Sequence, residues 1–98
     1  MKIEVSPKEY ERTLNWHDGM LYCSILTIDN KNDWRLPTTE ELKYIYDSEN
    51  DFDGSSYWSS TEYSKYGNMD AWSRSMASGD HYFHLKSNRF YVRAVRTI

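Results

Sequence analysis

The stretch "DWRLPTTEEL", from Asp33 to Leu42, places a tryptophan, an arginine and a proline directly before a predicted helix. Pro37 disfavours the α region for the residue before it, whereas its own fixed φ suits the approach to a helix. Thr38 and Glu41 have the spacing of a capping box, so we expect a helix over about Thr39 to Asp47. The stretch therefore predicts an extended segment that turns into a helix.

The residues of this extended segment alternate in direction. Trp34 and Leu36 lie two positions apart and share one side, which we expect to face the core, while Arg35 and Pro37 take the other side. We expect the guanidinium of Arg35 to bind neighbouring backbone or carboxylate groups. The segment is thus predicted to form a buried elbow on which the fold rests.

Upstream, "NWHDGMLYCSILTI" predicts a helix of about 12 residues that Asn15 caps. One face of this helix carries residues at helical spacing, namely Trp16, Gly19, Tyr22, Cys23 and Leu26. A glycine inside a helix costs about 1 kcal/mol relative to alanine, so another backbone or a bulky ring is expected to pack closely there.

The remaining sequence consists mainly of short segments typical of β-strands. "KIEV" near the start alternates polar and apolar residues, and after an acidic loop the short runs "YWSST", "DAWSRSM", "HYFHLKS" and "FYVRAVR" are β-prone. The last run reads as a central strand, with the N-terminal strand beside it. The predicted class is α+β, with two helices packed on a small, mostly antiparallel sheet with long loops.

Length and charge restrict the possibilities further. A chain of 98 residues supports one compact domain, residues 1–98. Twelve Lys and Arg against fifteen Asp and Glu give a net charge of −3 without a basic block, so no nucleic-acid partner is expected. No apolar run is long enough to cross a bilayer and the first residues lack an apolar signal core, so we expect a cytoplasmic protein with no membrane partner.

Catalytic residues are not apparent. Cys23 is the only cysteine, which excludes an internal disulfide, and its place on the inner face of a helix indicates a structural role. No G-x-S-x-G elbow surrounds a serine, and Ser59 and Ser60 are interpreted as buried hydrogen-bonding residues of a strand. We therefore expect no enzymatic activity.

Metal and cofactor sites are not expected either. Glu49, Asp51 and Asp53 resemble the opening of a calcium loop, but Ser60 stands where the bidentate glutamate would be needed. We interpret this segment as a solvated acidic loop. His81 and His84 point to opposite faces if they lie on a strand, so they are not expected to share a metal.

Five segments together resemble one family: "NWHDGMLYCSIL", "DWRLPTTEEL", "YWSST", "AW" and "YVRAVR", in this order and rough spacing. The chain resembles the Lcl-type C-terminal domain of collagen-like bacterial adhesins. That family is similar to C-type lectin-like folds and is distantly related to formylglycine-generating enzymes and to retroelement-diversified variable proteins. The resemblance implies binding of glycans or proteins. This chain differs from the family at Ala94, where many relatives carry a cysteine. Cys23 therefore lacks that partner.

The predicted binding residues lie in two polar connections, "EYSKYGNMDAW" and "ASGDHYFH". Tyrosines among Ser, Gly and Asn give contact area at low entropic cost. The candidate binding residues are Tyr63, Tyr66, Met69, Asp80, His81 and Tyr82. The four tryptophans are assigned mainly to the core. We expect a non-enzymatic module that binds a protein or glycan through Tyr-rich loops; the alternative is a small intracellular inhibitor or accessory protein, of phage or mobile-element origin, that binds a host protein.

Overall fold

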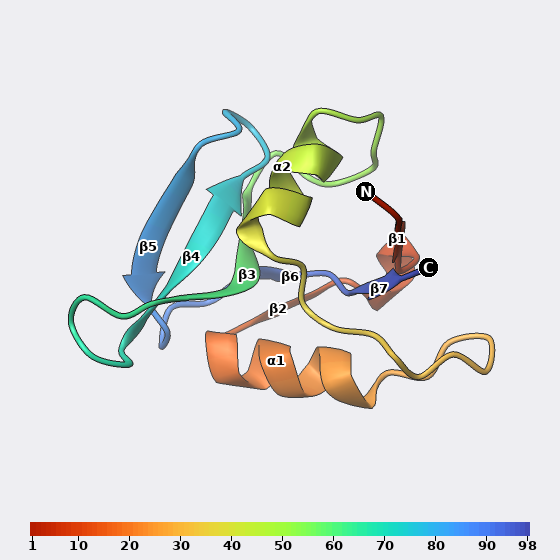
Figure 1. The fold of residues 1–98 in the computed structure, drawn as a ribbon, viewed down its shortest axis with the longest axis horizontal. Helices are drawn as coiled ribbons and strands as arrows, with labels where there is room; N and C mark the ends of the chain where they lie inside the picture. Colours follow the sequence, from red (N-terminus) through yellow and green to blue (C-terminus); the bar gives the residue numbers. More distant parts are fainter.

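The computed structural model describes residues 1–98 as two helices and two sheets (Figure 1). The strands are β1 (Ile3–Val5), β2 (Arg12–Leu14), β3 (Ser56–Tyr63), β4 (Asp70–Ser75), β5 (His81–Leu85), β6 (Phe90–Val92) and β7 (Val95–Thr97). The helices are α1 (Trp16–Ile25) and α2 (Thr39–Tyr46), with a short 3₁₀ turn over Lys8–Tyr10. None of the helices has the length and apolar character needed to cross a membrane.

The main sheet has five strands in the order β2-β6-β3-β4-β5. All its neighbours are antiparallel except β3 and β6, which run parallel. A second sheet pairs β1 with β7, which brings the two chain ends together (Figure 1). The predicted α+β class, with two helices and a mostly antiparallel sheet, is confirmed. The edge strand β2 was not predicted, because three residues offer too short a pattern to recognise.

The prediction that "FYVRAVR" forms one central strand is wrong. The run is divided between β6 in the main sheet and β7 in the small sheet, and β3 is the middle strand. The break falls at Arg93 and Ala94, whose polar groups bond outside any strand. The Arg93 guanidinium donates to the Ser6 carbonyl at 2.9 Å, and the Ala94 carbonyl accepts from the Ser6 N–H at 2.9 Å.

Helix α1 begins as the sequence predicts. Asn15 accepts a hydrogen bond from the Asp18 N–H at 2.9 Å and so satisfies one of the free donors of the first turn. The close contact expected at Gly19 is also present, although the neighbour is an aliphatic side chain. A Cβ atom built at Gly19 would lie 2.8 Å from Cγ2 of Val92. The glycine therefore lets the helix lie directly against β6.

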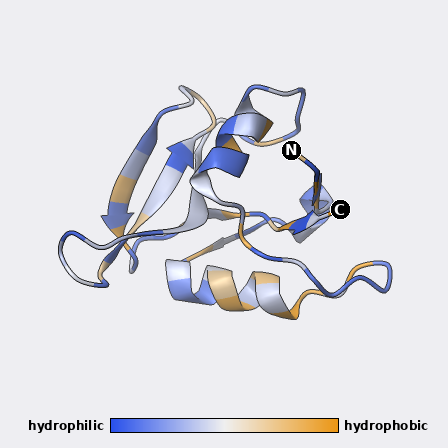
Figure 2. Ribbon diagram, in the orientation of Figure 1, coloured by the Kyte–Doolittle hydropathy of each residue, from blue (hydrophilic) through white to orange (hydrophobic).

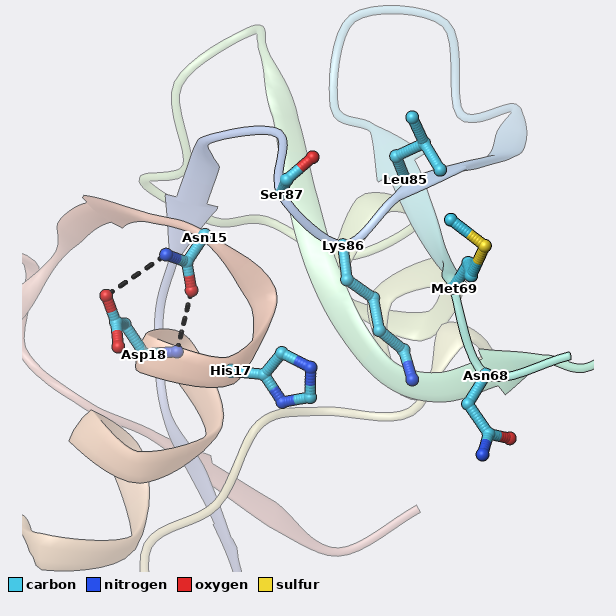
Figure 3. Close-up of a pocket in the computed structure, with 8 residues that line it drawn as sticks. All are labelled: Asn15, His17, Asp18, Asn68, Met69, Leu85, Lys86 and Ser87. Atoms are coloured by element: carbon cyan, nitrogen blue, oxygen red, sulfur yellow. Dashed lines mark hydrogen bonds between the residues drawn. The ribbon is translucent and has the colours of Figure 1, made fainter.

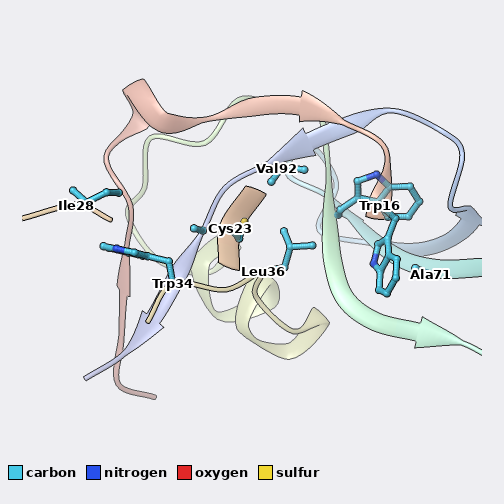
Figure 4. Close-up of a cluster of buried hydrophobic side chains, with 9 residues drawn as sticks. Trp16, Cys23, Ile28, Trp34, Leu36, Ala71 and Val92 are labelled. Carbon is cyan, nitrogen blue, oxygen red and sulfur yellow. The ribbon is translucent and has the colours of Figure 1, made fainter. Parts of the chain in front are cut away.

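The core lies between α1, the elbow and the main sheet (Figure 4). Three of the four tryptophans belong to it, and each indole N–H has a carbonyl acceptor: Trp16 bonds Ser59 at 2.9 Å, Trp34 bonds Lys31 at 3.1 Å and Trp58 bonds Leu14 at 3.2 Å. Burial of these large rings is thus achieved without unsatisfied donors. The fourth, Trp72, lies outside the core cluster, which corrects its assignment.

The elbow is buried as predicted, with one exception. Trp34 and Leu36 face the core, but Pro37 is fully buried as well, where an outward direction was expected. The Pro37 carbonyl accepts the Ser60 N–H at 2.8 Å, so the elbow lies against β3 and has no solvent side at this residue. Ser60 is accordingly half-buried, whereas Ser59 is fully buried, with its hydroxyl donating to the Trp72 carbonyl at 2.7 Å.

Helix α2 has the predicted capping box. The Thr38 hydroxyl accepts from the Glu41 N–H at 3.1 Å, and the Glu41 carboxylate accepts from the Thr38 N–H at 2.8 Å. The same carboxylate receives two hydrogen bonds from Arg35, at 2.6 and 2.7 Å. The prediction that Arg35 binds a carboxylate is therefore confirmed.

Candidate functional site

A group of aromatic rings covers one face of the sheet formed by β3, β4 and β5. We call it the aromatic surface; its members are Tyr63, Tyr66, Trp72, His81 and Phe83. Tyr63 and Phe83 stack with their centroids 4.1 Å apart and their planes 10° from parallel. Trp72 meets Tyr63 edge-on at 5.2 Å and lies 4.8 Å from His81. The rings form one continuous contact network on the protein surface.

Strand pairing explains why these rings meet. Trp72 on β4 lies opposite Phe83 on β5, and side chains two positions apart on a strand share a face. His81 therefore joins Phe83, and Tyr63 reaches them from the end of β3. A register shift in β3 between Trp58 and Glu62 separates the buried part of the strand from this exposed end.

Hydrogen bonds from Arg74, near the end of β4, fix the turn from β4 to β5. The buried Arg74 guanidinium donates to the Gly79 carbonyl at 2.6 Å and to the Thr39 carbonyl at 3.1 Å. Gly79 has a φ of +82°, and a side chain there would collide with the ring of Tyr46. The hairpin that carries the aromatic surface is thus tied to the start of α2.

The six predicted binding residues lie in four different places. Tyr63, Tyr66 and His81 all belong to the aromatic surface, but Tyr63 and His81 lie on strands and only Tyr66 lies in a loop. Tyr82 lies on β5 and shares the other face of the strand with His84, 6.4 Å away. Asp80 is exposed in the turn before β5. The expectation that loops carry these residues is therefore wrong for Tyr63, His81 and Tyr82. Strand β3 extends to Tyr63, beyond the β-prone run "YWSST", whereas His81 and Tyr82 belong to the β-prone run "HYFHLKS".

Met69 belongs to neither face and lines a pocket of about 450 Å³ (Figure 3). The pocket opens between the start of α1, the end of the loop before β4 and the turn after β5. Its lining residues are Asn15, His17, Asp18, Asn68, Met69, Leu85, Lys86 and Ser87. Six of the eight lining residues are polar or charged, and Met69 and Leu85 are the two hydrophobic ones.

Lys86 is the buried charged residue in the lining of this pocket. Its side chain is buried and its ammonium lies 4.3 Å from the centre of the Trp16 ring. Glu62 neutralises the charge through an ion pair of 2.7 Å. The ammonium therefore acts chiefly as a fixed link between the core and β3.

Trp72 and Phe83 are site residues that the sequence reasoning missed. The signal for Phe83 was present, because "HYFH" on a strand places His81 and Phe83 on the same side. Trp72 was missed because tryptophan was assigned to the core by residue type. Its ring is only half-buried, covered by Tyr63 and Phe83.

The single thiol is buried, whereas the three histidines contact aromatic rings. Burial raises the pKa of the Cys23 thiol to about 12, so this side chain stays protonated. Each histidine ring lies against an aromatic neighbour: His17 on Trp16, His81 on Trp72, and His84 on Phe90. His81 and His84 lie on opposite faces of β5, as predicted.

The acidic loop carries ion pairs within the domain. Asp51 bonds the buried guanidinium of Arg93 at 2.6 Å, and Asp53 lies 3.2 Å from the ammonium of Lys8. The hydrogen bond from Arg93 holds the pKa of Asp51 below its ordinary value. The interpretation of a purely solvated loop is thus incomplete, since two of its carboxylates tie the loop to the N- and C-terminal segments.

The fold is a small α+β domain that carries a group of exposed aromatic rings on one face of its main sheet. The chain belongs to the Lcl C-terminal domain family, whose sequence profile matches residues 4–96. The match covers nearly the whole chain and agrees with the resemblance seen in the sequence. A comparison with curated proteins found no match.

Proposed function

We propose that this domain is a non-enzymatic binding module that recognises a protein or glycan ligand through the aromatic surface. The observation that carries the proposal is that large aromatic rings remain exposed to solvent, although burying them would stabilise the domain. Phe83 is 43% exposed and Tyr66 is 60% exposed, although both touch other rings of the network. Membership of a binding-domain family supports the same reading.

The geometry of the rings suits binding. Tyr63 is stacked on Phe83 and braced by Trp72, so these rings lose little rotamer freedom when a ligand covers them. Rigid aromatic side chains are enriched among the residues that contribute most to binding free energy. The same flat rings can also stack on the apolar faces of sugars. Ser64, Lys65 and Asn68 supply exposed polar groups in the adjoining loop.

A variant pair tests the proposal. The double substitution Tyr66→Ser and Phe83→Ser removes two exposed rings of the aromatic surface and leaves the core cluster intact. Its matched control is Tyr44→Ser with Ile25→Ser, which removes an exposed tyrosine and an exposed aliphatic residue from the helices. Wild type and both variants are screened against arrays of immobilised glycans and of purified surface proteins.

The proposal predicts that the screen finds ligands that bind the wild type and the control variant equally. These ligands should not bind the Tyr66→Ser, Phe83→Ser variant. Circular dichroism of each protein checks that the fold is retained. Equal binding by all three proteins would exclude the aromatic surface as the recognition site.

A further inference from the structure

Asp70 is a nearly buried carboxylate on the face of the sheet that carries the aromatic surface. It is the first residue of β4, the strand between β3 and β5, and it is only 7% exposed. The strand register places Tyr63 opposite it on β3 and Leu85 opposite it on β5. Trp72 follows two positions later on β4 and therefore shares the same face. Three large side chains thus surround this carboxylate.

The charge of Asp70 has no partner within the chain. Neither a hydrogen bond nor an ion pair reaches its oxygens, whereas Asp33, Glu41 and Asp51 each bind a guanidinium. A carboxylate that loses water without gaining a partner costs free energy. The Ser6 hydroxyl is the one fully enclosed side-chain atom that lacks a hydrogen bond, so the Asp70 oxygens still reach solvent. A donor from outside the chain can therefore bind them.

Three cations of neighbouring segments bind other groups. Arg74 lies further along β4, and its guanidinium donates to backbone carbonyls of α2 and of the turn before β5. Lys86 follows β5 and pairs with Glu62. Lys65 lies 5.6 Å from the centre of the Tyr66 ring and forms no ion pair. This last contact indicates that the surface can hold a cation over one of its rings.

The rings beside Asp70 supply the second part of a cation site. Aromatic faces attract cations electrostatically, and a guanidinium is the most frequent partner. Tyr66 and Phe83 keep much of their surface exposed, and the apolar part of β5 is the orange segment of that strand in Figure 2. The net charge of −3 also favours a cationic partner. Charge and ring chemistry thus agree on the sign of the ligand.

Building on the proposed binding function, we propose that the aromatic surface recognises an arginine side chain of a partner protein. Its guanidinium pairs with the Asp70 carboxylate and stacks on the adjoining rings. A guanidinium is planar, so it can bond both oxygens of a carboxylate and still lie on an aromatic face. The ammonium of lysine is a point charge without a flat face. Arginine therefore suits both parts of the site.

A stability comparison tests whether Asp70 serves binding or folding. Asp70→Asn keeps the size of the side chain and removes its charge. We expect this variant to be at least as stable as the wild type, because no hydrogen bond or ion pair is lost. Asp80→Asn is the matched control, since it makes the same change in net charge at an exposed carboxylate. A clear loss of thermal stability in Asp70→Asn alone would assign Asp70 a structural role and overturn the proposal.

A peptide titration tests the ligand directly. The probe is a blocked peptide with one arginine between glycines, and its matched control carries citrulline, which has nearly the same shape without the charge. Each peptide is titrated into the full chain at about 1 to 10 mM and followed by NMR. We expect the arginine peptide, but not the citrulline peptide, to shift the signals of the Trp72 indole and the Phe83 amide. Asp70→Asn should weaken this binding about tenfold or more, whereas Asp80→Asn should keep the wild-type affinity.

Two further probes distinguish the source of the cation. Glucosamine carries an ammonium on a sugar, and choline carries the quaternary ammonium of a lipid headgroup. We expect both to bind more weakly than the arginine peptide, because neither can form the paired hydrogen bonds of a guanidinium. Tighter binding of either probe, equal binding of the citrulline peptide, or an unchanged affinity of Asp70→Asn would overturn the proposal.

The ligands found in the array screen separate the arginine site from the proposed function. We expect these ligands to lose binding to both Asp70→Asn and the Tyr66→Ser, Phe83→Ser variant. If only the Tyr66→Ser, Phe83→Ser variant loses binding, the aromatic surface stands as the recognition site and the arginine assignment is wrong. If neither variant loses binding, the surface itself is excluded.

Discussion

Arg35 and Glu41 are joined by two hydrogen bonds, of 2.6 and 2.7 Å, at the point where the elbow turns into α2. The Glu41 carboxylate also accepts the Thr38 N–H and so completes the helix cap. One nearly buried carboxylate thus fixes the direction of the chain on both sides of Pro37. The elbow and the helix are parts of a single bonded unit.

Glu41→Gln should destabilise the domain by about 1 to 3 kcal/mol, because the guanidinium of Arg35 loses its charged partner. Glu40→Gln is the control, since Glu40 is an exposed neighbour in the same turn of α2. Urea unfolding of both variants measures the difference. Equal stability of the two variants would show that the Arg35 pair contributes nothing.

Acid should weaken the fold through the paired carboxylates. Hydrogen bonds from Arg35 lower the pKa of Glu41, and those from Arg93 lower the pKa of Asp51. A lowered folded pKa gives stability that is fully present above the unfolded value, about 4 for these groups, and is lost as the pH falls through the folded value. Unfolding free energy should therefore decrease from neutral pH to about pH 3. The decrease should be smaller in Glu41→Gln; an identical pH profile would exclude a contribution from this carboxylate.

Trp34→Ala should cost about 3 to 5 kcal/mol, because it leaves a cavity beneath the elbow. Total stability of a domain of this kind is about 5 to 10 kcal/mol, so much of the variant would be close to unfolding. Tyr44→Ala, at an exposed ring on α2, serves as the comparison. Thermal melts provide the measurement, and a melting temperature for Trp34→Ala within a few degrees of wild type would contradict the buried elbow.

Gly19→Ala should destabilise α1, although alanine is the better helix former by about 1 kcal/mol. The added methyl group would lie 2.8 Å from Cγ2 of Val92, and such overpacking typically costs about 1 to 3 kcal/mol. The same substitution in a Val92→Ala background should become neutral or stabilising. Chemical unfolding of the four proteins gives the coupling. A gain in stability on Gly19→Ala in the wild-type background would show that the contact relaxes without cost.

Local signals in the sequence predicted the helices well. The capping box of Thr38 and Glu41, the Asn15 cap and the close contact at Gly19 are all set by residues near one another or by one helix face. The paired directions of Trp34 and Leu36 were equally local. These features depend on backbone geometry that a few residues determine.

The sheet was less predictable, because pairing between distant strands leaves little trace in one strand. No feature of the sequence "FYVRAVR" indicates that Arg93 bonds the Ser6 carbonyl and so divides the run into two strands. The aromatic surface likewise arises from the β4 to β5 register, which brings Trp72 opposite Phe83. The sequence indicated several of its residues, but their division between two faces required the pairing.

The most direct test of the central claim is a titration of one ligand from the array screen into dilute wild type, the Tyr66→Ser, Phe83→Ser variant and the Tyr44→Ser, Ile25→Ser control. If the aromatic surface is the recognition site, the Tyr66→Ser, Phe83→Ser variant loses at least about 2 kcal/mol of binding free energy, which is roughly 30-fold in Kd. The control keeps the wild-type affinity. A Kd unchanged in the surface variant, with its fold intact by circular dichroism, would contradict recognition through this face.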